Sequence, residues 1–243
     1  MSVNFRAALF DLDGTLLYTL PDIRDAMNRV LAARSLPQYD VEAYRQMVGW
    51  GLKRLAELAV PAGRRGEVDI SELAEELKRE YARTAVVHTS PYDGVRELID
   101  ELKRRGLPMA VLSNKAQELT QHIVETVFGG ATFDAVYGAR EGLPNKPHPG
   151  AAIAIAEELG VATTDMVFIG DTAIDMETAQ AAGMYPVGVD WGYRDVEELW
   201  MHGAATVMSS PQQIRALILD DEDTEDTEDT ENAQGEIGNR DNT

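Results

Sequence analysis

The sequence predicts an α/β fold, in which a Rossmann-like, doubly wound parallel sheet carries a small inserted helical domain. Two observations predict the sheet: apolar runs of strand length recur along the chain, and amphipathic segments of helical length separate them. A third observation predicts the insert. Residues 17–90 contain helical patterns and no convincing strand, whereas a crossover helix between parallel strands needs only about a dozen residues.

The expected strands and helices of the sheet domain alternate in chain order. The expected strands are residues 7–10, 109–112, 135–137, 166–169, 186–189 and 206–208. The expected helices are residues 94–105, 116–128, 150–159, 173–182 and 211–217. In the first of these helices, apolar residues recur at helical spacing from Val95 to Leu102, and Gly106 follows as a stop signal. This alternation predicts helices on both faces of the sheet.

The rest of the chain divides into the insert and a C-terminal tail. The helical patterns of the insert are residues 22–33, 41–48, 52–59 and 71–85. From Asp220 onward, eleven Asp or Glu stand against one Arg, and such like-charge repulsion without apolar residues predicts disorder. We therefore expect three parts: a core of residues 1–16 and 91–219, a helical domain of residues 17–90 and a disordered acidic tail of residues 220–243.

The composition excludes several classes of protein. The net charge of −20 argues against a nucleic-acid binder, because binding to phosphate backbones needs clustered Lys and Arg. The absence of cysteine excludes disulfides and Cys-based metal sites or nucleophiles. No apolar run approaches the ~20 residues that cross a bilayer, and the first residues lack the apolar region of a secretory signal. We expect a cytoplasmic protein that does not enter membranes.

Carboxylates follow two of the expected strands. Asp11 and Asp13 come directly after residues 7–10, and Asp171 and Asp175 follow the strand at 166–169. Ligands of doubly wound sheets bind beyond the carboxyl ends of the strands, so we expect these side chains to meet there. Four carboxylates in one place repel one another without a cation, and their oxygens suit Mg²⁺. This pattern favours a Mg²⁺ site over the alternative in which the carboxylates only cap helices.

Two further strand ends or loops carry residues suited to phosphate. Ser113 and Asn114 follow the strand at 109–112, where a hydroxyl and a backbone N–H can hold a phosphate oxygen. Either side chain could equally well cap the helix that follows. Lys146 stands in NKPHPG, where rigid turns could fix it near anionic charge, although a surface position is the alternative.

In this order and spacing, the four groups resemble the haloacid dehalogenase-like hydrolase superfamily. The resemblance rests on DLDGTL at 11–16, SN at 113–114, KPHP at 146–149 and GDTAID at 170–175, and it covers residues 7 to about 208. One DxD motif alone is weak, whereas the ordered set of four is specific. The helical insert resembles the type-1 cap of this superfamily, and the neighbouring sequence is most similar to its phosphoglycolate phosphatase branch.

The resemblance implies a role for each motif. Asp11 would be the nucleophile that forms an aspartyl-phosphate, and Asp13 would be the general acid and base. Mg²⁺ would be bound by Asp11, Asp171 and the backbone carbonyl of Asp13, with Asp175 as a ligand or as a partner of a ligand. Lys146 would assist catalysis by pairing with Asp11. The phosphoryl oxygens would be bound by Thr15, Ser113, Asn114 and Lys146.

The reaction implied is Mg²⁺-dependent hydrolysis of a small phosphorylated metabolite, with 2-phosphoglycolate as the leading substrate, by a monomer or homodimer. Dehalogenases of the superfamily lack the second Asp, so Asp13 favours a phosphatase. The chain departs from the phosphoglycolate phosphatase branch at Tyr18 and Thr19, where that branch usually has Asp-Ser, and this leaves the substrate open. The candidate contacts to the rest of the substrate are Tyr18, Gly49, Trp50, Lys53 and Arg194.

Other functions remain compatible with the same motifs. A pyrophosphatase, a sugar-phosphate phosphatase or a hexose-phosphate mutase would use this scaffold. A non-catalytic protein that binds a partner through the fold and its acidic tail is the alternative from a different class. The presence of Asp11, Asp13, Lys146 and Asp171 together favours an enzyme.

Overall fold

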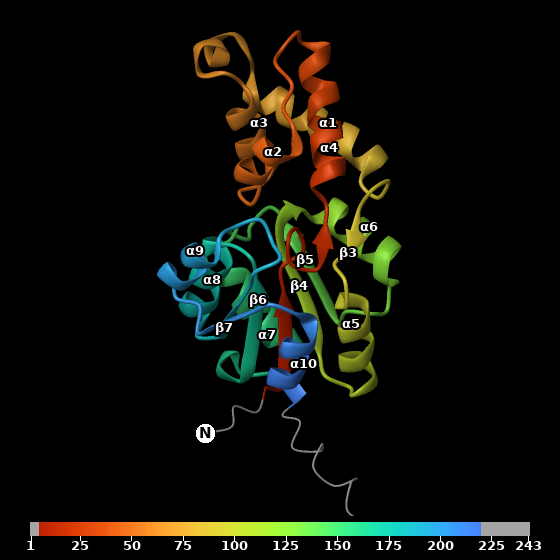
Figure 1. Cartoon of the computed structure of the whole chain (residues 1–243), viewed down its shortest axis with the longest axis vertical. Helices are drawn as coiled ribbons and strands as arrows, with labels where there is room; N and C mark the ends of the chain where they lie inside the picture. The colour runs from red at the N-terminus through yellow and green to blue at the C-terminus, as the bar shows by residue number, and fades with distance from the viewer. Residues whose placement is uncertain (1–4, 220–243) are drawn as a thin grey trace, which may run out of the picture.

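The computed structural model describes residues 5–219 of the chain, and the tail expected at residues 220–243 lies outside the described residues. Within the described part, a six-stranded sheet has the strand order β5-β4-β1-β6-β7-β8, and all neighbouring strands are parallel. The strands are β1 (Ala7–Phe10), β4 (Met109–Ala116), β5 (Ala135–Ala139), β6 (Met166–Gly170), β7 (Tyr185–Val189) and β8 (Thr206–Met208). The structure thus confirms the predicted doubly wound α/β sheet (Figure 1).

The sheet is buried on both faces, which explains why its strands are apolar without a polar alternation. Ala8 and Phe10 of β1 belong to one hydrophobic cluster, and Ala7 and Leu9 belong to the other. Five helices supply most of the cover. The first cluster includes residues from α5 (Val95–Arg104), α6 (Gln117–Phe128) and α10 (Pro211–Leu219), and the second includes residues from α7 (Gly150–Leu159) and α8 (Ala173–Ala182).

The register of β1 determines where the site lies. Phe10, the last residue of β1, pairs with Val111 of β4 and Ile169 of β6. The strand order runs in opposite directions on the two sides of β1, and this is the place where doubly wound sheets bind ligands. The residues that follow β1 and β6, and the last residues of β4, therefore meet at one edge.

Four helices lie beyond this edge of the sheet (Figure 1). They are α1 (Leu20–Ala33), α2 (Val41–Met47), α3 (Leu52–Ala59) and α4 (Ile70–Thr84), with a 3₁₀ segment at Ala62–Glu67. The amphipathic helix α4 buries Leu73, Leu77 and Tyr81 and packs on both α1 and α3. These helices occupy the range in which the sequence predicts a helical insert.

The chain passes between the sheet and these helices through a small antiparallel ribbon. The ribbon consists of β2 (Leu17–Tyr18) and β3 (Ser90–Pro91), in which Leu17 pairs with Pro91. The sequence analysis missed both strands, because two residues are too few to show a periodic pattern. It also missed α9 (Val196–Met201). The expected boundaries of the insert, 16/17 and 90/91, fall on this ribbon.

One boundary correction changes the interpretation of the site. Strand β4 continues to Ala116, four residues beyond its predicted end, so Ser113 and Asn114 belong to the strand. Helix α6 begins at Gln117, and its N-cap, Ala116, makes no side-chain hydrogen bond to the helix. The alternative in which Ser113 or Asn114 caps this helix is therefore wrong.

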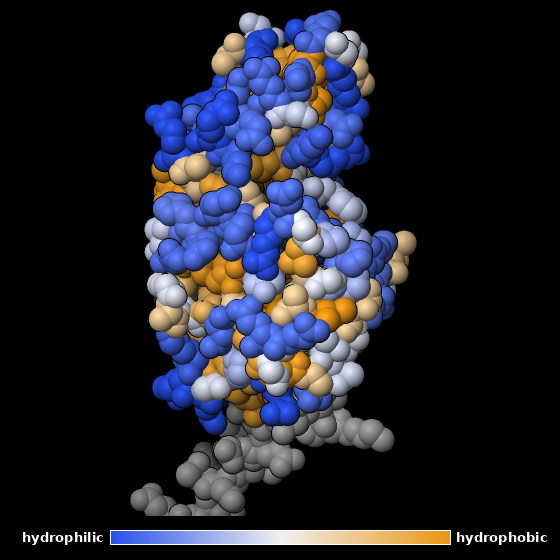
Figure 2. Space-filling view, turned by 180° about the vertical axis from the view of Figure 1, so that it is seen from behind, coloured by the Kyte–Doolittle hydropathy of each residue, from blue (hydrophilic) through white to orange (hydrophobic). Residues whose placement is uncertain are grey.

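No helix between residues 5 and 219 combines the length and the hydropathy that crossing a bilayer requires. On the face drawn in Figure 2, hydrophobic residues are interrupted by hydrophilic ones.

Candidate active site

Asp11 stands at the centre of the site, directly after the middle strand of the sheet. Its backbone N–H donates to the carbonyl oxygen of Ile169, which continues the pairing of β1 with β6 past the end of the strand. Its side chain is buried, and Oδ1 lies 2.6 Å from Nζ of Lys146. The resemblance stated above implied this pair, whose members are 135 positions apart in the sequence, and the structure brings the two side chains together.

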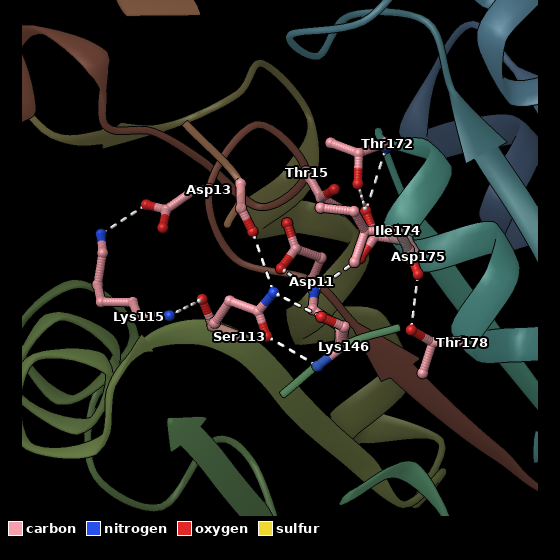
Figure 3. Close-up of polar contacts among 12 residues, drawn as sticks. Asp11, Asp13, Thr15, Ser113, Lys115, Lys146, Thr172, Ile174, Asp175 and Thr178 are labelled. Atoms are coloured by element: carbon pink, nitrogen blue, oxygen red, sulfur yellow. Dashed lines mark hydrogen bonds and ion pairs between the residues drawn. The ribbon is translucent and has the colours of Figure 1, made fainter. Parts of the chain in front are cut away.

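Lys146 joins two carboxylates. Its ammonium lies 2.6 Å from Oδ1 of Asp11 and 2.6 Å from Oδ1 of Asp175 (Figure 3). Burial alone would lower the pKa of Lys146, but the two carboxylates outweigh it and hold the pKa above its ordinary value. The side chain therefore stays cationic at neutral pH, which excludes the alternative of a solvated surface lysine.

Three carboxylates form a group that could hold a metal ion. One oxygen of each of Asp11, Asp171 and Asp175 lies within 4.8 Å of the others, and all three residues are buried. Burial raises the pKa of Asp11 well above its ordinary value; Lys146 opposes this rise, and the neighbouring carboxylates add to it. Burial and then Asp175 raise the pKa of Asp171 to about 7. Burial and neighbouring carboxylates thus raise the pKa of Asp11 and of Asp171, and a hard divalent cation at this place would stabilise their ionised forms.

Short polar side chains and backbone amides orient these carboxylates. Oδ1 of Asp171 accepts a hydrogen bond from the hydroxyl of Thr15 at 2.9 Å, and Oδ2 accepts one from the backbone N–H of Tyr193 at 2.7 Å. Oδ2 of Asp175 accepts bonds from the backbone N–H and the hydroxyl of Thr172, which form the capping box of α8. The hydroxyl of Thr15 is thus directed to Asp171, and Thr15 is not among the described residues that line the cavity. The expectation that Thr15 binds phosphate is not supported.

Asp13 lies apart from the group of three. Its Oδ1 accepts hydrogen bonds from Nζ of Lys115 and from the hydroxyl of Thr19, both at 2.6 Å. The side chain of Asp13 is 18% exposed, twice the 9% of Asp11. Asp13 thus lies outside the group of three carboxylates that could hold a metal, and it lines the cavity together with Asp11 and Asp175 of that group.

Lys115 is the functional candidate that the sequence analysis missed. Its ammonium is buried and contacts Asp13 of the core together with Oη of Tyr81, at 2.8 Å, from helix α4. Burial opposes the charge of Lys115, but Asp13 outweighs it and raises the pKa. The only signal in the sequence was its place directly after Ser113 and Asn114, and that signal did not reveal a contact with the insert.

Asn114 holds other parts of the site in place. Its Nδ2 donates to the carbonyl oxygens of Gly49, at 3.1 Å, and of Lys146, at 3.0 Å, and its Oδ1 accepts from the backbone N–H of Lys146 at 2.9 Å. Both amide hydrogens are therefore used, so the side chain is not available to phosphate oxygens. Ser113 accepts a bond from the N–H of Lys115 at 3.2 Å, and its own hydroxyl hydrogen can still be donated.

A cavity of about 50 Å³ lies between the sheet edge and the helices, which is room for a few water molecules. The core side carries the polar groups, among them Asp11, Asp13 and Lys146. The wall formed by the helical insert is apolar. It consists of Ile23, Val48, Leu52 and Leu55 with Gly49 and Gly51.

The structure brings only one of the five expected substrate contacts to this cavity, and that one is Gly49. Tyr18 lines a separate hollow beside the β2-β3 ribbon. Trp50 and Lys53 line a further hollow, to which Gly51, Leu52 and Asn114 also contribute. The guanidinium of Arg194 donates to the carbonyl oxygens of Arg45 and Val48. The expectation that these four side chains contact substrate is therefore not supported by their positions.

Arg194 has a different role, which it shares with Arg45. Arg45 of α2 donates at 2.9 Å to the carbonyl oxygens of Gly192 and Tyr193, in the loop after β7. Arg194 returns hydrogen bonds from this loop to carbonyl oxygens of α2 and of the residue that follows it. The two arginines thus join the helical insert to the loop that also supplies an N–H to Asp171.

Comparison with known proteins gives consistent matches. A family model described as haloacid dehalogenase-like hydrolase matches residues 8–189. A phosphoglycolate phosphatase of Xylella fastidiosa is 33% identical over 196 residues, which cover 79% of this chain and 83% of that protein.

Two solved structures are similar along nearly the whole described chain. A crystal structure from Lactobacillus delbrueckii subsp. bulgaricus, provisionally described as a phosphoglycolate phosphatase, has a TM-score of 0.81 at 28% identity and covers 88% of this chain and 98% of that one. The structure of CbbY from Rhodobacter sphaeroides in complex with phosphate has a TM-score of 0.75 at 25% identity and covers 86% and 96% of the two chains.

Proposed function

Because the chain belongs to the haloacid dehalogenase-like hydrolase family, we propose that it is a Mg²⁺-dependent phosphatase for a small phosphomonoester, with 2-phosphoglycolate as the leading substrate. The observation that carries the proposal is the arrangement around Asp11, where a buried lysine and two further carboxylates meet at the end of the middle strand. The name of the Xylella fastidiosa relative supports 2-phosphoglycolate.

In this proposal Asp11 attacks the phosphorus atom and forms an aspartyl-phosphate, while the bond to the leaving oxygen breaks. Attack requires ionised Asp11, and the ammonium of Lys146, 2.6 Å away, favours that form against the effect of burial. Bound Mg²⁺ would neutralise charge on the phosphoryl oxygens, with Asp11, Asp171 and Asp175 as the nearest side chains to hold it.

Asp13 acts as the acid and base. It gives a proton to the leaving alcohol and later takes one from the water that hydrolyses the aspartyl-phosphate. Its place in the cavity wall beside Asp11 supports this role. The hydrogen bonds from Lys115 and Thr19 to one carboxyl oxygen leave the other oxygen for proton transfer.

The phosphoryl oxygens are bound by the hydroxyl of Ser113 and the ammonium of Lys146. Asn114 acts as a positioning residue, because its side chain forms hydrogen bonds with both the backbone N–H and the backbone C=O of Lys146. This division replaces the expectation that Thr15 and the Asn114 side chain bind phosphate directly.

Residues 17–90 form the cap, and the β2-β3 ribbon is the hinge on which it moves. Support comes from the cavity, whose walls are shared between the core and the cap helices. Closing the cap excludes bulk water from the aspartyl-phosphate and selects the leaving group by its fit to the apolar wall.

A sugar-phosphate phosphatase is the second candidate, favoured by the similarity to CbbY, a mutant of which was solved in complex with xylulose-(1,5)bisphosphate. The cavity of about 50 Å³ favours a compact leaving group over a sugar.

The experiment is release of inorganic phosphate from a panel of phosphorylated metabolites and a generic aryl phosphate, with Mg²⁺ and with EDTA. We expect Mg²⁺-dependent release that is largest for 2-phosphoglycolate, and loss of turnover in the folded Asp11→Asn variant. Metal-independent release, or substantial activity of Asp11→Asn, contradicts the mechanism. A higher kcat/KM for a sugar phosphate moves the assignment to the second candidate.

A further inference from the structure

The cavity contains two lysines, and their surroundings differ. Among the described residues that line it, Lys115 and Lys146 are the only cationic side chains. Lys146 is bound by two carboxylates, those of Asp11 and Asp175. Lys115 is bound by one carboxylate, that of Asp13, and by the neutral phenol of Tyr81. Within residues 5–219 these are the acceptors that Lys115 has, so one of its three ammonium hydrogens can serve a ligand.

The position of Lys115 relates it to the leaving group and not to the phosphoryl group. Its Nζ lies 2.6 Å from the carboxyl of Asp13, and a general acid must come within about 2.6–3.2 Å of the oxygen that it protonates. An anionic group carried on the carbon next to that oxygen would therefore lie close to Lys115. In 2-phosphoglycolate, the carboxylate occupies this position.

The remaining walls offer little to such an anion. The cap side chains that face the cavity are Ile23, Val48, Leu52 and Leu55, which cannot replace the water lost from a carboxylate. Gly51, the N-cap of α3, and Leu52, its first residue, also line the cavity, and the positive end of this helix adds to the attraction of a negative ligand. A buried carboxylate needs a charged partner, and Lys115 is the one within reach.

We propose that Lys115 is a specificity-determining residue, which binds a carboxylate carried by the leaving alcohol on the carbon next to the phosphorylated oxygen. The substrate class is therefore the phosphate esters of short 2-hydroxy acids. This inference rests on the proposed phosphatase function and adds to it the group that selects the substrate. Tyr81 presents a neutral acceptor from the cap, so it orients the ammonium without neutralising its charge.

The test compares two esters that differ in one group. In 2-hydroxyethyl phosphate, a CH₂OH group replaces the carboxylate of 2-phosphoglycolate. The kcat/KM of each ester is measured with Mg²⁺ for the wild-type chain and for Lys115→Met, which keeps an unbranched side chain one atom shorter and removes the charge. Lys103→Gln, on the exposed face of α5, is the control for loss of one positive charge.

We expect the wild type and Lys103→Gln to prefer 2-phosphoglycolate. In Lys115→Met, this preference should fall by about 10- to 100-fold, the range for a hydrogen bond to a charged group. An equal fall for both esters overturns the inference, because Lys115 would then act only by holding Asp13. A wild type that hydrolyses both esters equally well overturns it too, and leaves the phosphatase function intact. Absence of Mg²⁺-dependent hydrolysis of any ester removes the proposed function, and this inference with it.

A second measurement needs no variant. Glycolate and ethylene glycol are tested as competitive inhibitors of the wild-type chain with Mg²⁺ in excess. We expect an inhibition constant for glycolate at least tenfold lower than for ethylene glycol. Equal inhibition constants overturn the inference, even where Lys115→Met does not fold.

Discussion

Gly192 offers a way to disturb the proposed metal site without replacing any of the three carboxylates. A Cβ atom added at this position would lie 2.2 Å from Cβ of Asp171 and 2.5 Å from its Oδ2. Carbon atoms in contact are normally about 3.5–4.0 Å apart, so either Asp171 or the loop must move by more than 1 Å. The N–H of the next residue, Tyr193, donates to Asp171, and this bond is lost or distorted by either movement.

The expected cost of Gly192→Ala has two parts. Overpacking of a buried site lowers the free energy of unfolding by about 1–3 kcal/mol, which corresponds to a fall in Tm of roughly 2–12 °C for a chain of this length. Displacing a partner that orients a ligand lowers metal affinity by about 10- to 100-fold. The concentration of Mg²⁺ that gives half-maximal phosphate release should rise by this factor.

The assay combines thermal denaturation with and without Mg²⁺ and a Mg²⁺ titration of phosphate release. Gly63→Ala is the matched control, because a Cβ at Gly63 meets no atom within 4 Å. We expect Gly63→Ala to behave as wild type in both measurements. If Gly192→Ala keeps the Tm and the Mg²⁺ requirement of the control, Asp171 is not held as described and does not contribute to a metal site.

Two further predictions concern pH and the loop of Lys146. Without a bound metal ion, as in EDTA, folding raises the pKa of Asp171 from 3.8 to about 7. The folded state therefore binds this proton more tightly than the unfolded state, and the free energy of unfolding falls as the pH rises between these two values. The Tm in EDTA should therefore be lower at pH 8 than at pH 6, and adding Mg²⁺ at pH 8 should restore it. If the Tm of Asp171→Asn in EDTA fell by the same amount between pH 6 and pH 8, the prediction would be contradicted. Asn114→Ala removes three hydrogen bonds to Lys146 and Gly49. Denaturation should show a free energy of unfolding lower by about 1–3 kcal/mol, and steady-state kinetics should show a lower kcat. A kcat equal to that of wild type would show that these bonds do not position Lys146.

The sheet could be predicted because its signal is local. Each strand is a short apolar run bounded by polar residues, and burial on both faces of a parallel sheet requires such runs. The position of Asp11 at the end of β1 followed from the same pattern, and so did its expected meeting with Asp171 across the sheet edge. Strand β4 was predicted too short, because Ser113, Asn114 and Lys115 are polar yet buried in the strand. Asn114 and Lys115 have side-chain partners from other parts of the chain, and Ser113 accepts a hydrogen bond from the N–H of Lys115.

The contacts between cap and core could not be predicted, since they depend on how two separate sets of helices and strands face each other. Tyr81 is an ordinary buried position of an amphipathic helix by its pattern, and only the placement of α4 brings its phenol to Lys115. For the same reason Arg194 was taken as a substrate contact, although its acceptors are carbonyl oxygens of Arg45 and Val48. Every residue has a backbone carbonyl, so the residue type of the acceptor does not reveal such a hydrogen bond.

Because several hydrogen bonds between cap and core are accepted by backbone carbonyl oxygens, the substrate preference can change by mutation while these bonds remain. The side chains of Arg45, Arg194 and Asn114 connect the two parts of the molecule. Each donates hydrogen bonds to backbone carbonyl oxygens of the opposite part. An acceptor of this kind survives replacement of its own side chain. Val48, which lines the cavity and offers its carbonyl to Arg194, can therefore be exchanged for a residue of another size or polarity while the bond remains. Substitutions at such positions can therefore change which leaving group fits the cavity while the contacts between cap and core are kept.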